Sequence, residues 1–355
     1  MMLLKPLEKQ GFKNRVVLAP MTRARADEGG VPNDMMLEYY IQRSDAGLMI
    51  SEGVHISPQG AGWDGASGIW RQDQIDGWKK ITDGVHQHNP DAKFAMQLWH
   101  LGRQMHSDVS GMPIVSASEI PLKGQVSAKK GEKKDPEVPH MLTEDEIADT
   151  VRDYAVAAKN AMEAGFDMVE IHAANGYLID AFLQSATNKR TDKYGQDRLL
   201  FMKQVVDAIL EDVPASKVGI RFSPNGVFGE MGSADNTETF TKALEFVGSK
   251  ELAFVHLLDG LGFGFHELCE PFTLKYARSI VKGMCIIGNC GYTKETAEEQ
   301  IKAGNADMVS FGRPFISTPD LVYRFANNIE LNPPAEYGIW YSRGAEGYTT
   351  FEKAK

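Results

Sequence analysis

A chain of 355 residues with 43% hydrophobic content can bury roughly three quarters of its unfolded surface, which excludes a largely disordered protein. Its formal net charge of -10, with basic residues clustered only at 129–134, argues against a nucleic-acid partner. The apolar runs stop far short of the ~20 residues that a bilayer span requires, and Lys5 and Pro6 interrupt the first run before a signal peptide could form. The composition therefore predicts a soluble cytoplasmic protein with no membrane partner.

Short β-rich runs alternate with helical stretches from one end of the sequence to the other. The predicted strands span residues 15–20, 47–54, 93–99, 166–173, 217–223, 252–258, 284–289 and 307–312. The predicted helices span residues 33–46, 73–88, 143–164, 197–211, 236–249, 273–282, 293–303 and 318–327. The strands are almost continuously apolar, which is typical of parallel strands covered on both faces. At the start of the third helix, Thr143 and Glu146 have the spacing of a capping box.

Eight units of strand and helix with right-handed crossovers close most naturally into a single (β/α)8 TIM barrel of the α/β class, for which roughly 250 residues suffice. We therefore expect one domain over residues 1–355. The remaining length is assigned to the lid-like insertion 102–142 after the third strand, to segments 224–235 and 259–272, and to the C-terminal tail 329–355. The alternative is a doubly wound open sheet, but no glycine-rich dinucleotide turn follows the first strand. The nearest motif, GLGFGF from Gly260, lacks the third glycine and follows the sixth strand.

Active sites in this fold lie at the carboxyl ends of the strands, so the residues at those ends are the candidate site. In strand order these residues are Ala19, Pro20, Met21 and Thr22; Glu52 and Gly53; Gln97, Trp99 and His100; His172, Asn175 and Tyr177; Arg221; His256 and Asp259; Gly288 and Asn289; and Gly312 and Arg313. They form a polar and aromatic rim with mixed hydrogen-bond donors. The rim contains no lysine, which disfavours a Schiff-base aldolase.

Two arginines at the strand ends predict negatively charged groups of a ligand. In SFGRP the glycine lets an oxygen approach the backbone and Arg313 offers a charge-assisted fork, at the place where barrels of this kind bind phosphate. Arg221 ends an inner strand, where a buried charge is costly unless an anion or a dipole meets it. The alternatives are an internal salt bridge from Arg221 to Glu52 or Asp259, and a surface ion pair for Arg313.

Seven segments of the sequence match a known family in order and at the expected strand ends. They are NRVVLAPMTRARA, YYIQRSDAGLMISEG, QLWHLGR, EIHAANGYLIDAFLQSATNKRTDKYG, GIRFSP, FGRPFISTPDL and GAEGYTTF. With these segments, which extend over nearly the whole chain, the sequence resembles the old yellow enzyme family of FMN-dependent ene-reductases. The resemblance implies a (β/α)8 barrel with FMN across its mouth, reduced by NADPH or NADH and oxidised by activated alkenes.

The resemblance also implies a role for each matching position. Toward the flavin it places Ala19, Pro20, Met21, His172, Thr22 at the O4 edge, Gly53 and Gln97 at the pyrimidine end, Arg221 near N1 and O2, and Gly288, Asn289, Gly312 and Arg313 at the phosphate. Toward the substrate it places His172 and Asn175 on a carbonyl or nitro oxygen, Tyr177 as the proton donor, and Trp99 and Tyr341 as walls. Thr22 together with Trp99 resembles the classical branch of the family.

The sequence departs from the family's pattern in two motifs. HAAN stands where HGAN is more usual, so Ala173 replaces a flexible residue, with no expected effect on donor placement. After KYG the family's GSIENR is shortened to QDR, in which Arg198 matches the arginine. This shortening concerns the rim and the substrate range more than flavin binding. The insertion 102–142 resembles a mobile lid, but it cannot be matched residue by residue.

Two functions from other classes compete with this prediction. A metal-dependent barrel hydrolase would use His100, His172, His256 and Glu52 as ligands, but such enzymes usually show His-x-His at the first strand, and this strand has none. We therefore expect no metal site. A non-catalytic flavin-binding barrel would have no use for the three polar residues of EIHAANGYL together.

Several alternatives stay open at this point. Trp99 and Tyr341 could be plain packing residues. The physiological oxidant could be an enone, a maleimide, a nitroalkene or other nitro compound, a nitrate ester or a quinone. The sequence does not specify NADPH over NADH, nor the oligomeric state.

Overall fold

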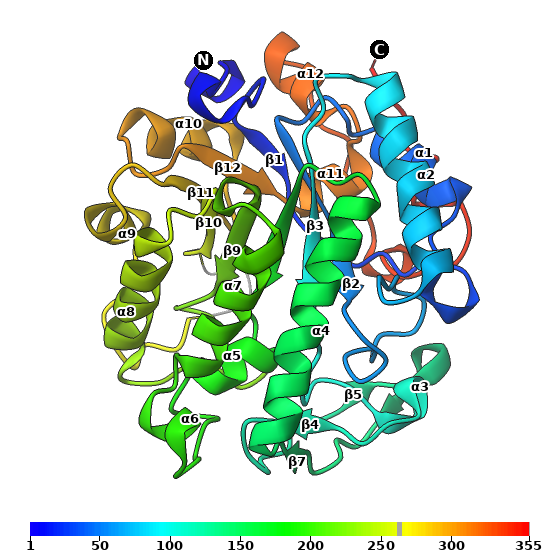
Figure 1. Ribbon diagram of the computed structural model, residues 1–355. Coiled ribbons are helices and arrows are strands. Elements are labelled where there is room, and N and C mark those ends of the chain that lie inside the picture. The colour runs from blue at the N-terminus through cyan, green and yellow to red at the C-terminus, as the bar shows by residue number, and fades with distance from the viewer. Residues whose placement is uncertain (261–264, 355) are drawn as a thin grey trace.

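The computed structural model describes residues 1–260 and 265–354. Its centre is a closed barrel of eight parallel strands (Figure 1). These strands are β1 (Val16–Leu18), β2 (Leu48–His55), β3 (Phe94–Trp99), β8 (Met168–His172), β9 (Val218–Phe222), β10 (Phe254–Leu258), β11 (Cys285–Asn289) and β12 (Met308–Phe311). The barrel closes because β1 pairs with both β2 and β12, with Val17 opposite Leu48 and Val16 opposite Val309. The predicted barrel and its eight strands are confirmed, and the open sheet is wrong. Part of the GLGFGF motif lies outside the described residues.

Helices surround the barrel in the predicted alternation. The predicted helices are present as α1 (Asp34–Ile41), α2 (Gln72–His88), α4 (Glu144–Glu163), α7 (Leu200–Asp212), α8 (Asn236–Ser249), α9 (Leu274–Ile280), α10 (Lys294–Lys302) and α12 (Leu321–Asn327). Three short helices are additional: α5 (Leu178–Leu183) and α6 (Lys193–Gln196) lie between β8 and α7, and α11 (Arg313–Ser317) lies between β12 and α12. The capping box of α4 is confirmed, because the Thr143 hydroxyl accepts from the Glu146 N–H and the Glu146 carboxylate accepts from the Thr143 N–H.

The amino-terminal end of the barrel is closed by apolar packing. Leu7 and Phe12 exchange two backbone hydrogen bonds of 2.8 and 3.3 Å, and this turn presents the Phe12 ring to the barrel. The apolar residues packed with Phe12 are Val17, Leu48, Ile50, Ala95, Met168, Phe254, Cys285, Ile287 and Met308. A dry cluster of this kind offers no polar group for catalysis, so the chemistry belongs to the opposite end, where the strands finish.

The insertion 102–142 lies at that opposite end, at the bottom of Figure 1. Its elements are α3 (Ser107–Ser110), β4 (Val115–Ser116), β5 (Val126–Ser127), β6 (Lys133–Lys134) and β7 (His140–Met141). β4 pairs with β7 in parallel, and β5 pairs with β6 in an antiparallel hairpin. The pairing of β4 with β7 brings residues 115–116 beside residues 140–141 at the end of the insertion, and these two strands form its stem.

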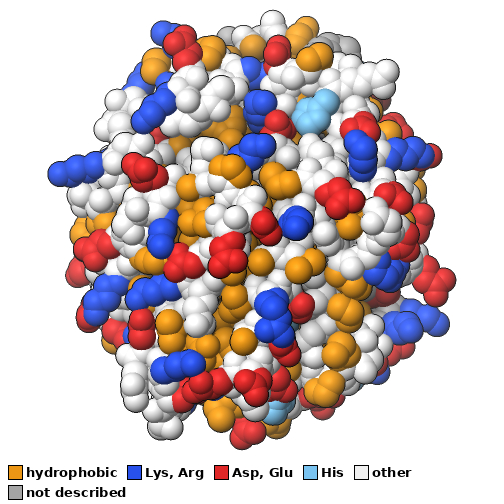
Figure 2. Space-filling view, in the orientation of Figure 1, with side chains coloured by type: hydrophobic (Ala, Val, Ile, Leu, Met, Phe, Trp, Pro, Cys, Tyr) orange, Lys and Arg blue, Asp and Glu red, His pale blue; other side chains and the backbone are white. Residues whose placement is uncertain are grey.

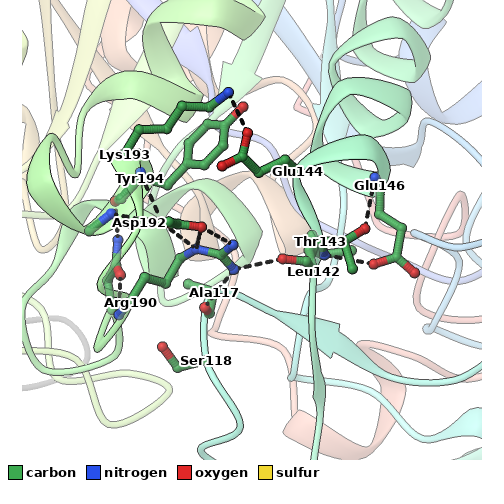
Figure 3. A network of polar contacts seen from close by, with 12 residues as sticks. Ala117, Ser118, Leu142, Thr143, Glu144, Glu146, Arg190, Asp192, Lys193 and Tyr194 are labelled. Carbon is green, nitrogen blue, oxygen red and sulfur yellow. Dashed lines mark hydrogen bonds and ion pairs between the residues drawn. The ribbon is translucent and has the colours of Figure 1, made fainter.

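Arg190 attaches this stem to the segment after α5 (Figure 3). Its buried guanidinium donates to the carbonyl oxygens of Leu142, at 2.7 Å, and Ala117, at 3.2 Å, and it is paired with Asp192. The Asp192 carboxylate also accepts from the Tyr194 N–H at the start of α6. One arginine therefore joins both sides of the stem to a helix cap.

Arg190→Met is expected to loosen the insertion, because it removes the arginine donor from two buried carbonyl oxygens, at a cost of roughly 1–3 kcal/mol for each unsatisfied group. Cleavage by thermolysin within residues 102–142 should accelerate relative to the wild type. The matched control is Lys193→Met, which breaks the exposed ion pair of Lys193 with Glu144 on the same segment and should have little effect. Equal cleavage rates in the two variants would show that Arg190 does not hold the stem.

The face that carries α4 and α7 has a mixed charge. In Figure 2 acidic and basic side chains are interspersed over this face, with apolar side chains between them and no extended region of one sign. A mixed surface of this kind lacks the basic stripe that binds a phosphate backbone. Within residues 1–260 and 265–354, no helix combines the length and the apolar character that crossing a bilayer demands.

Candidate active site

Three predicted site residues meet at the carboxyl ends of β3 and β8. The ring centroids of His172 and Tyr177 are 4.9 Å apart, and those of Trp99 and Tyr177 are 5.0 Å apart. Trp99 stacks on His172 at 6.5 Å between centroids. The structure thus brings an imidazole, a phenol and an indole from two strand ends into one cluster.

The turn that connects His172 to Tyr177 has an unusual backbone. Asn175 and Gly176 both have left-handed conformations, with φ of 57° and 72°. Asparagine and glycine tolerate this region better than other residues, which explains their presence here. Ala173 is not among the residues with positive φ, and its N–H continues the ladder to the carbonyl oxygen of Arg221 at 3.0 Å. The alanine of HAAN therefore causes no backbone strain.

The electrostatics of the cluster suit a neutral hydrogen-bond donor beside a neutral acid. Burial, together with the nearby Arg221 guanidinium, holds the pKa of His172 well below its usual value, so the imidazole is uncharged at neutral pH. Its Nδ1 is buried and has no hydrogen-bond partner among the described residues. Burial raises the pKa of the Tyr177 phenol, which therefore stays protonated. The site can hold a proton on Tyr177 and offer a hydrogen bond from His172.

Arg221 is the buried cation of the site. Its Nη2 donates to the Asn289 side-chain oxygen at 2.8 Å, and its Nε has no partner within the described part of the chain. Burial lowers the pKa of Arg221, because the charged form is desolvated. Among the described residues Arg221 is hydrogen-bonded to a neutral amide and has the Glu170 carboxylate as a nearby charge, and its free Nε leaves room for a ligand with negative charge or carbonyl oxygens.

The internal salt bridges considered for Arg221 are wrong. The Glu52 carboxylate accepts instead from the Arg23 N–H at 3.1 Å and from the Ser67 hydroxyl at 2.9 Å. The Asp259 carboxylate accepts from the Tyr292 hydroxyl at 2.7 Å. Because both carboxylates have other partners, neither compensates the charge of Arg221.

A buried polar network lies beside Arg221, and sequence reasoning missed two of its four members, Glu170 and Ser310. Gln97 donates to Glu170 at 2.8 Å, Glu170 contacts His256 Nδ1 at 2.7 Å, and His256 Nε2 contacts the Ser310 hydroxyl at 2.7 Å. The four side chains come from β3, β8, β10 and β12 and are all buried. Glu170 within the predicted strand 166–173 was an available signal, since a buried carboxylate needs partners.

The same network shows whether the residues of the alternative metal-dependent hydrolase are free to bind a metal. His256 is engaged with Glu170 and Ser310, and Glu52 lies with Arg23 and Ser67. Across residues 1–260 and 265–354, His, Cys, Asp and Glu side chains nowhere form a group of three that could hold a metal ion. The donor set of the alternative hydrolase is therefore not assembled among the described residues.

The residues expected at a phosphate lie at the ends of β11 and β12. Asn289 donates to the carbonyl oxygen of Ser310 at 3.1 Å, which fixes the two strand ends side by side. Gly288 is buried, and a Cβ there would lie 2.7 Å from Leu274. Gly312 precedes α11, whose first residue Arg313 is exposed with its guanidinium 5.6 Å from the centre of the Trp340 ring. Arg313 forms no ion pair with a described carboxylate, so the surface-ion-pair alternative is wrong.

The segment after β1 lies next to these strand ends. Ala19 and Pro20 are buried, whereas Met21 and Thr22 are partly exposed. A Cβ added to Gly312 would lie 3.4 Å from the sulfur of Met21, so the ends of β1 and β12 adjoin. In β2, a Cβ at Gly53 would approach the Trp99 ring to 2.5 Å, and Gly53 thus has a packing reason to be glycine.

The C-terminal tail supplies an aromatic wall. Tyr341 packs on Trp63 at 5.1 Å between centroids, and Trp63 lies 6.5 Å from Trp99. Two buried arginines of APMTRARA hold this tail, since Arg23 and Arg25 donate to the Trp340 carbonyl oxygen at 2.9 and 2.6 Å. Sequence reasoning placed Tyr341 here but missed Trp63 and both arginines, although two charges in a buried segment were a signal.

Comparison with known proteins agrees with this geometry. The model of the NADH:flavin oxidoreductase / NADH oxidase family matches residues 3–332. The 12-oxophytodienoate reductase 7 of Oryza sativa subsp. japonica is 36% identical over 373 residues, covering 98% of this chain and 94% of the relative. The old yellow enzyme homologue from Zymomonas mobilis has a TM-score of 0.93 and 37% identity, covering 99% of both chains. Morphinone reductase in complex with tetrahydroNAD has a TM-score of 0.91 and 34% identity, covering 100% of this chain and 98% of that one.

The agreement extends over the barrel and over the strand ends that carry the site. The matched family segment contains His172, Tyr177, Trp99 and Arg221, whose geometry was described above. A buried arginine with one neutral partner fits the negatively charged side of a bound flavin. The chain belongs to the NADH:flavin oxidoreductase / NADH oxidase family, of which FMN is the cofactor.

Proposed function

We propose that His172 and Asn175 bind the activating oxygen of an alkene substrate and that Tyr177 supplies the proton. The chain is an FMN-dependent NAD(P)H ene-reductase by its family, and these assignments describe how its own residues would perform the reduction. The observation that supports them is the cluster of His172, Tyr177 and Trp99 at the strand ends. In it a neutral imidazole and a protonated phenol lie within one small site.

The residues present fit FMN. Arg221 would meet the N1 and O2 side of the ring, because within residues 1–260 and 265–354 this buried guanidinium has an unpartnered Nε and is hydrogen-bonded to a neutral amide. The other residues proposed to contact FMN are Ala19, Pro20, Met21, Thr22, Gly53, Gln97 and His172 at the ring, and Gly288, Asn289, Gly312 and Arg313 at the phosphate. When bound, FMN accepts a hydride from NAD(P)H and delivers it to the β-carbon of the alkene.

The residues of the chain then have two tasks. Negative charge develops on the carbonyl or nitro oxygen of the substrate, and the donors of His172 and Asn175 stabilise it in the manner of an oxyanion hole. Tyr177 protonates the α-carbon, which a phenol held beside those donors can reach. If Tyr177 lies on the face opposite the hydride donor, hydrogen is added trans. NAD(P)H and the alkene should bind in turn and give ping-pong kinetics.

The substrate class follows from these donors. Two hydrogen-bond donors on one oxygen bind a carbonyl or nitro group, and hydride addition to a β-carbon requires that this group be conjugated with the alkene. Enones, maleimides, nitroalkenes and quinones are therefore the proposed substrates, with Trp99, Trp63 and Tyr341 as walls. The test is a steady-state screen of these compounds with NADPH and with NADH. The purified protein should be yellow and should bleach when NADPH is added without air. A colourless protein that fails to bind FMN would contradict the proposal.

Arg221→Met is expected to weaken FMN binding roughly 10- to 100-fold, because a hydrogen bond from a charged group contributes ~1.5–3 kcal/mol. Fluorescence titration of the apoprotein with FMN measures the dissociation constant. The control is Arg278→Met, which removes a partly buried arginine that is paired with Asp307 at the other end of β12. The proposed flavin contact of Arg221 is wrong if both variants bind FMN like the wild type.

A further inference from the structure

Asp180 lies on α5, three residues after Tyr177, and is fully buried. Its carboxylate accepts a hydrogen bond from the Gly176 N–H at 2.8 Å and one from the Gln184 side-chain amide at 2.8 Å. A third hydrogen bond comes from the Ser223 hydroxyl at the end of β9. The carboxylate therefore touches the turn that carries Asn175 and the strand end behind it.

Every partner of Asp180 is a donor. The Gly176 N–H can only donate. Gln184 presents its amide nitrogen, because its oxygen accepts from the Gly232 N–H at 2.9 Å and the Asn236 amide at 3.1 Å. The Ser223 oxygen accepts from the Asn175 N–H at 2.7 Å, so its own proton is available to Asp180. Three converging donors require an acceptor at each position, which an ionised carboxylate supplies and an amide or a protonated acid does not.

The turn that these bonds hold is costly by itself. The cost lies at Asn175, because a left-handed backbone is strained for a residue other than glycine and persists only where the surroundings fix it, whereas Gly176 adopts it freely. Three hydrogen bonds fix this turn: the Ser223 oxygen accepts from the Asn175 N–H, the Asp180 carboxylate accepts from the Gly176 N–H, and the Gln104 side-chain amide donates to the Asn175 carbonyl oxygen. Without them the turn would relax, and the Asn175 side chain would move relative to His172.

We propose that Asp180 is a positioning residue whose ionised carboxylate, directly through Gly176 and indirectly through Ser223, sets the Asn175 donor and the Tyr177 phenol against His172. This inference rests on the proposed roles of those three residues. It adds to them a group that never touches the substrate and decides whether the donors converge on one oxygen.

The surroundings of Asp180 give the proposal a pH dependence. Burial raises the pKa of Asp180 to about 7, and the charged group that acts on it is Arg103, from the loop after β3, which favours the ionised form. Gln184 and Ser223 are uncharged, and the neighbouring His172 and Tyr177 stay neutral. The donors of His172 and Asn175 should therefore converge above about pH 7, where Asp180 is ionised, and lose their alignment below it.

The same ionisation has the opposite effect on stability. The unfolded chain ionises Asp180 near the ordinary value of 3.8, whereas the folded chain holds the proton up to about 7. Between these values the folded state binds more protons, so this residue's contribution to stability falls as the pH rises, while substrate alignment improves. A residue retained only for stability would not show this opposition.

The experiment measures cyclohexanone binding to the FMN-loaded enzyme through the change in flavin absorbance between pH 5.5 and 8.5. This saturated ketone presents the same oxygen without being reduced. The wild type should bind it more tightly as the pH rises through about 7. Asp180→Asn should bind it roughly 10- to 100-fold more weakly above that pH, with no inflection, and should retain FMN. A wild-type affinity with the inflection intact in Asp180→Asn overturns the proposal.

A second variant keeps the test decisive if Asp180→Asn fails to load FMN. Ser223→Ala leaves the carboxylate in place but removes the oxygen that accepts from the Asn175 N–H. It should weaken cyclohexanone binding while the inflection near pH 7 persists, and unchanged binding overturns the proposal. If the roles proposed for His172 and Tyr177 are themselves wrong, variants of those two residues will reduce cyclohexenone at the normal rate. That result is distinct from any result for the Asp180 and Ser223 variants.

Discussion

Replacing Tyr177 with phenylalanine is expected to lower cyclohexenone turnover by ~10²- to 10⁴-fold, the range typical of a lost general acid. The ring of Tyr177 contacts His172 and Trp99 edge-to-face, and phenylalanine preserves both contacts. FMN binding and the rate of reduction by NADPH should therefore stay near wild type. Stopped-flow measurement of the two half-reactions separates these effects. The matched control is Tyr154→Phe, which removes the hydroxyl of a buried tyrosine on α4 and should leave turnover unchanged.

A nitroalkene separates the role of Tyr177 from that of His172. Its reduction leaves the negative charge on nitro oxygens, so the product can leave before a carbon is protonated. Nitroalkene reduction should thus survive Tyr177→Phe, whereas His172→Ala should slow both substrates because it removes a donor to the developing charge. A Tyr177→Phe enzyme that reduces cyclohexenone at the wild-type rate would sink the assignment of the proton donor.

Acidification from pH 7 to about 4 is expected to lower the free energy of unfolding by several kcal/mol. The reason is that buried histidines, which are neutral in the folded protein, gain protons once the chain unfolds. Burial lowers the pKa of both His55 and His100 to about 3, and it holds the pKa of His172 well below its usual value. The unfolded chain protonates these residues near 6.5, so between pH 6.5 and 3 it binds more protons than the folded chain. His55 and His100 each contribute on the order of 4 kcal/mol of lost stability by pH 3, against a typical total of roughly 5–15 kcal/mol, and His172 acts in the same direction.

Urea unfolding at several pH values checks this expectation. Glu52 and Asp180, whose pKa values are raised by burial, act in the opposite direction and reduce the slope. His55→Phe should flatten the profile, since it removes one titrating group and retains a ring against Trp99, on which His55 stacks at 5.3 Å. A stability that stays constant between pH 7 and 4.5 would contradict the proposed burial of neutral histidines.

The sequence by itself determined the elements and the end of the barrel that carries the chemistry. Continuous apolar runs predicted the strands, and Thr143 with Glu146 marked the start of α4, because such signals depend on neighbours within a few residues. Strand order then placed His172, Tyr177, Trp99 and Arg221 on one rim, since parallel strands of a barrel all finish at the same end.

Only the tertiary structure decided which polar groups meet. The partner of Arg221 is Asn289, and Glu170 joins Gln97 to His256, although these pairs lie 68, 73 and 86 residues apart in the chain. Their meeting depends on the stagger of strands around a closed barrel, which no local pattern encodes. The hold of Arg23 on Trp340, across 317 residues, has the same origin. A buried polar side chain must find a partner, so the sequence could predict the need for one, but the choice among distant candidates was made by closure of the fold.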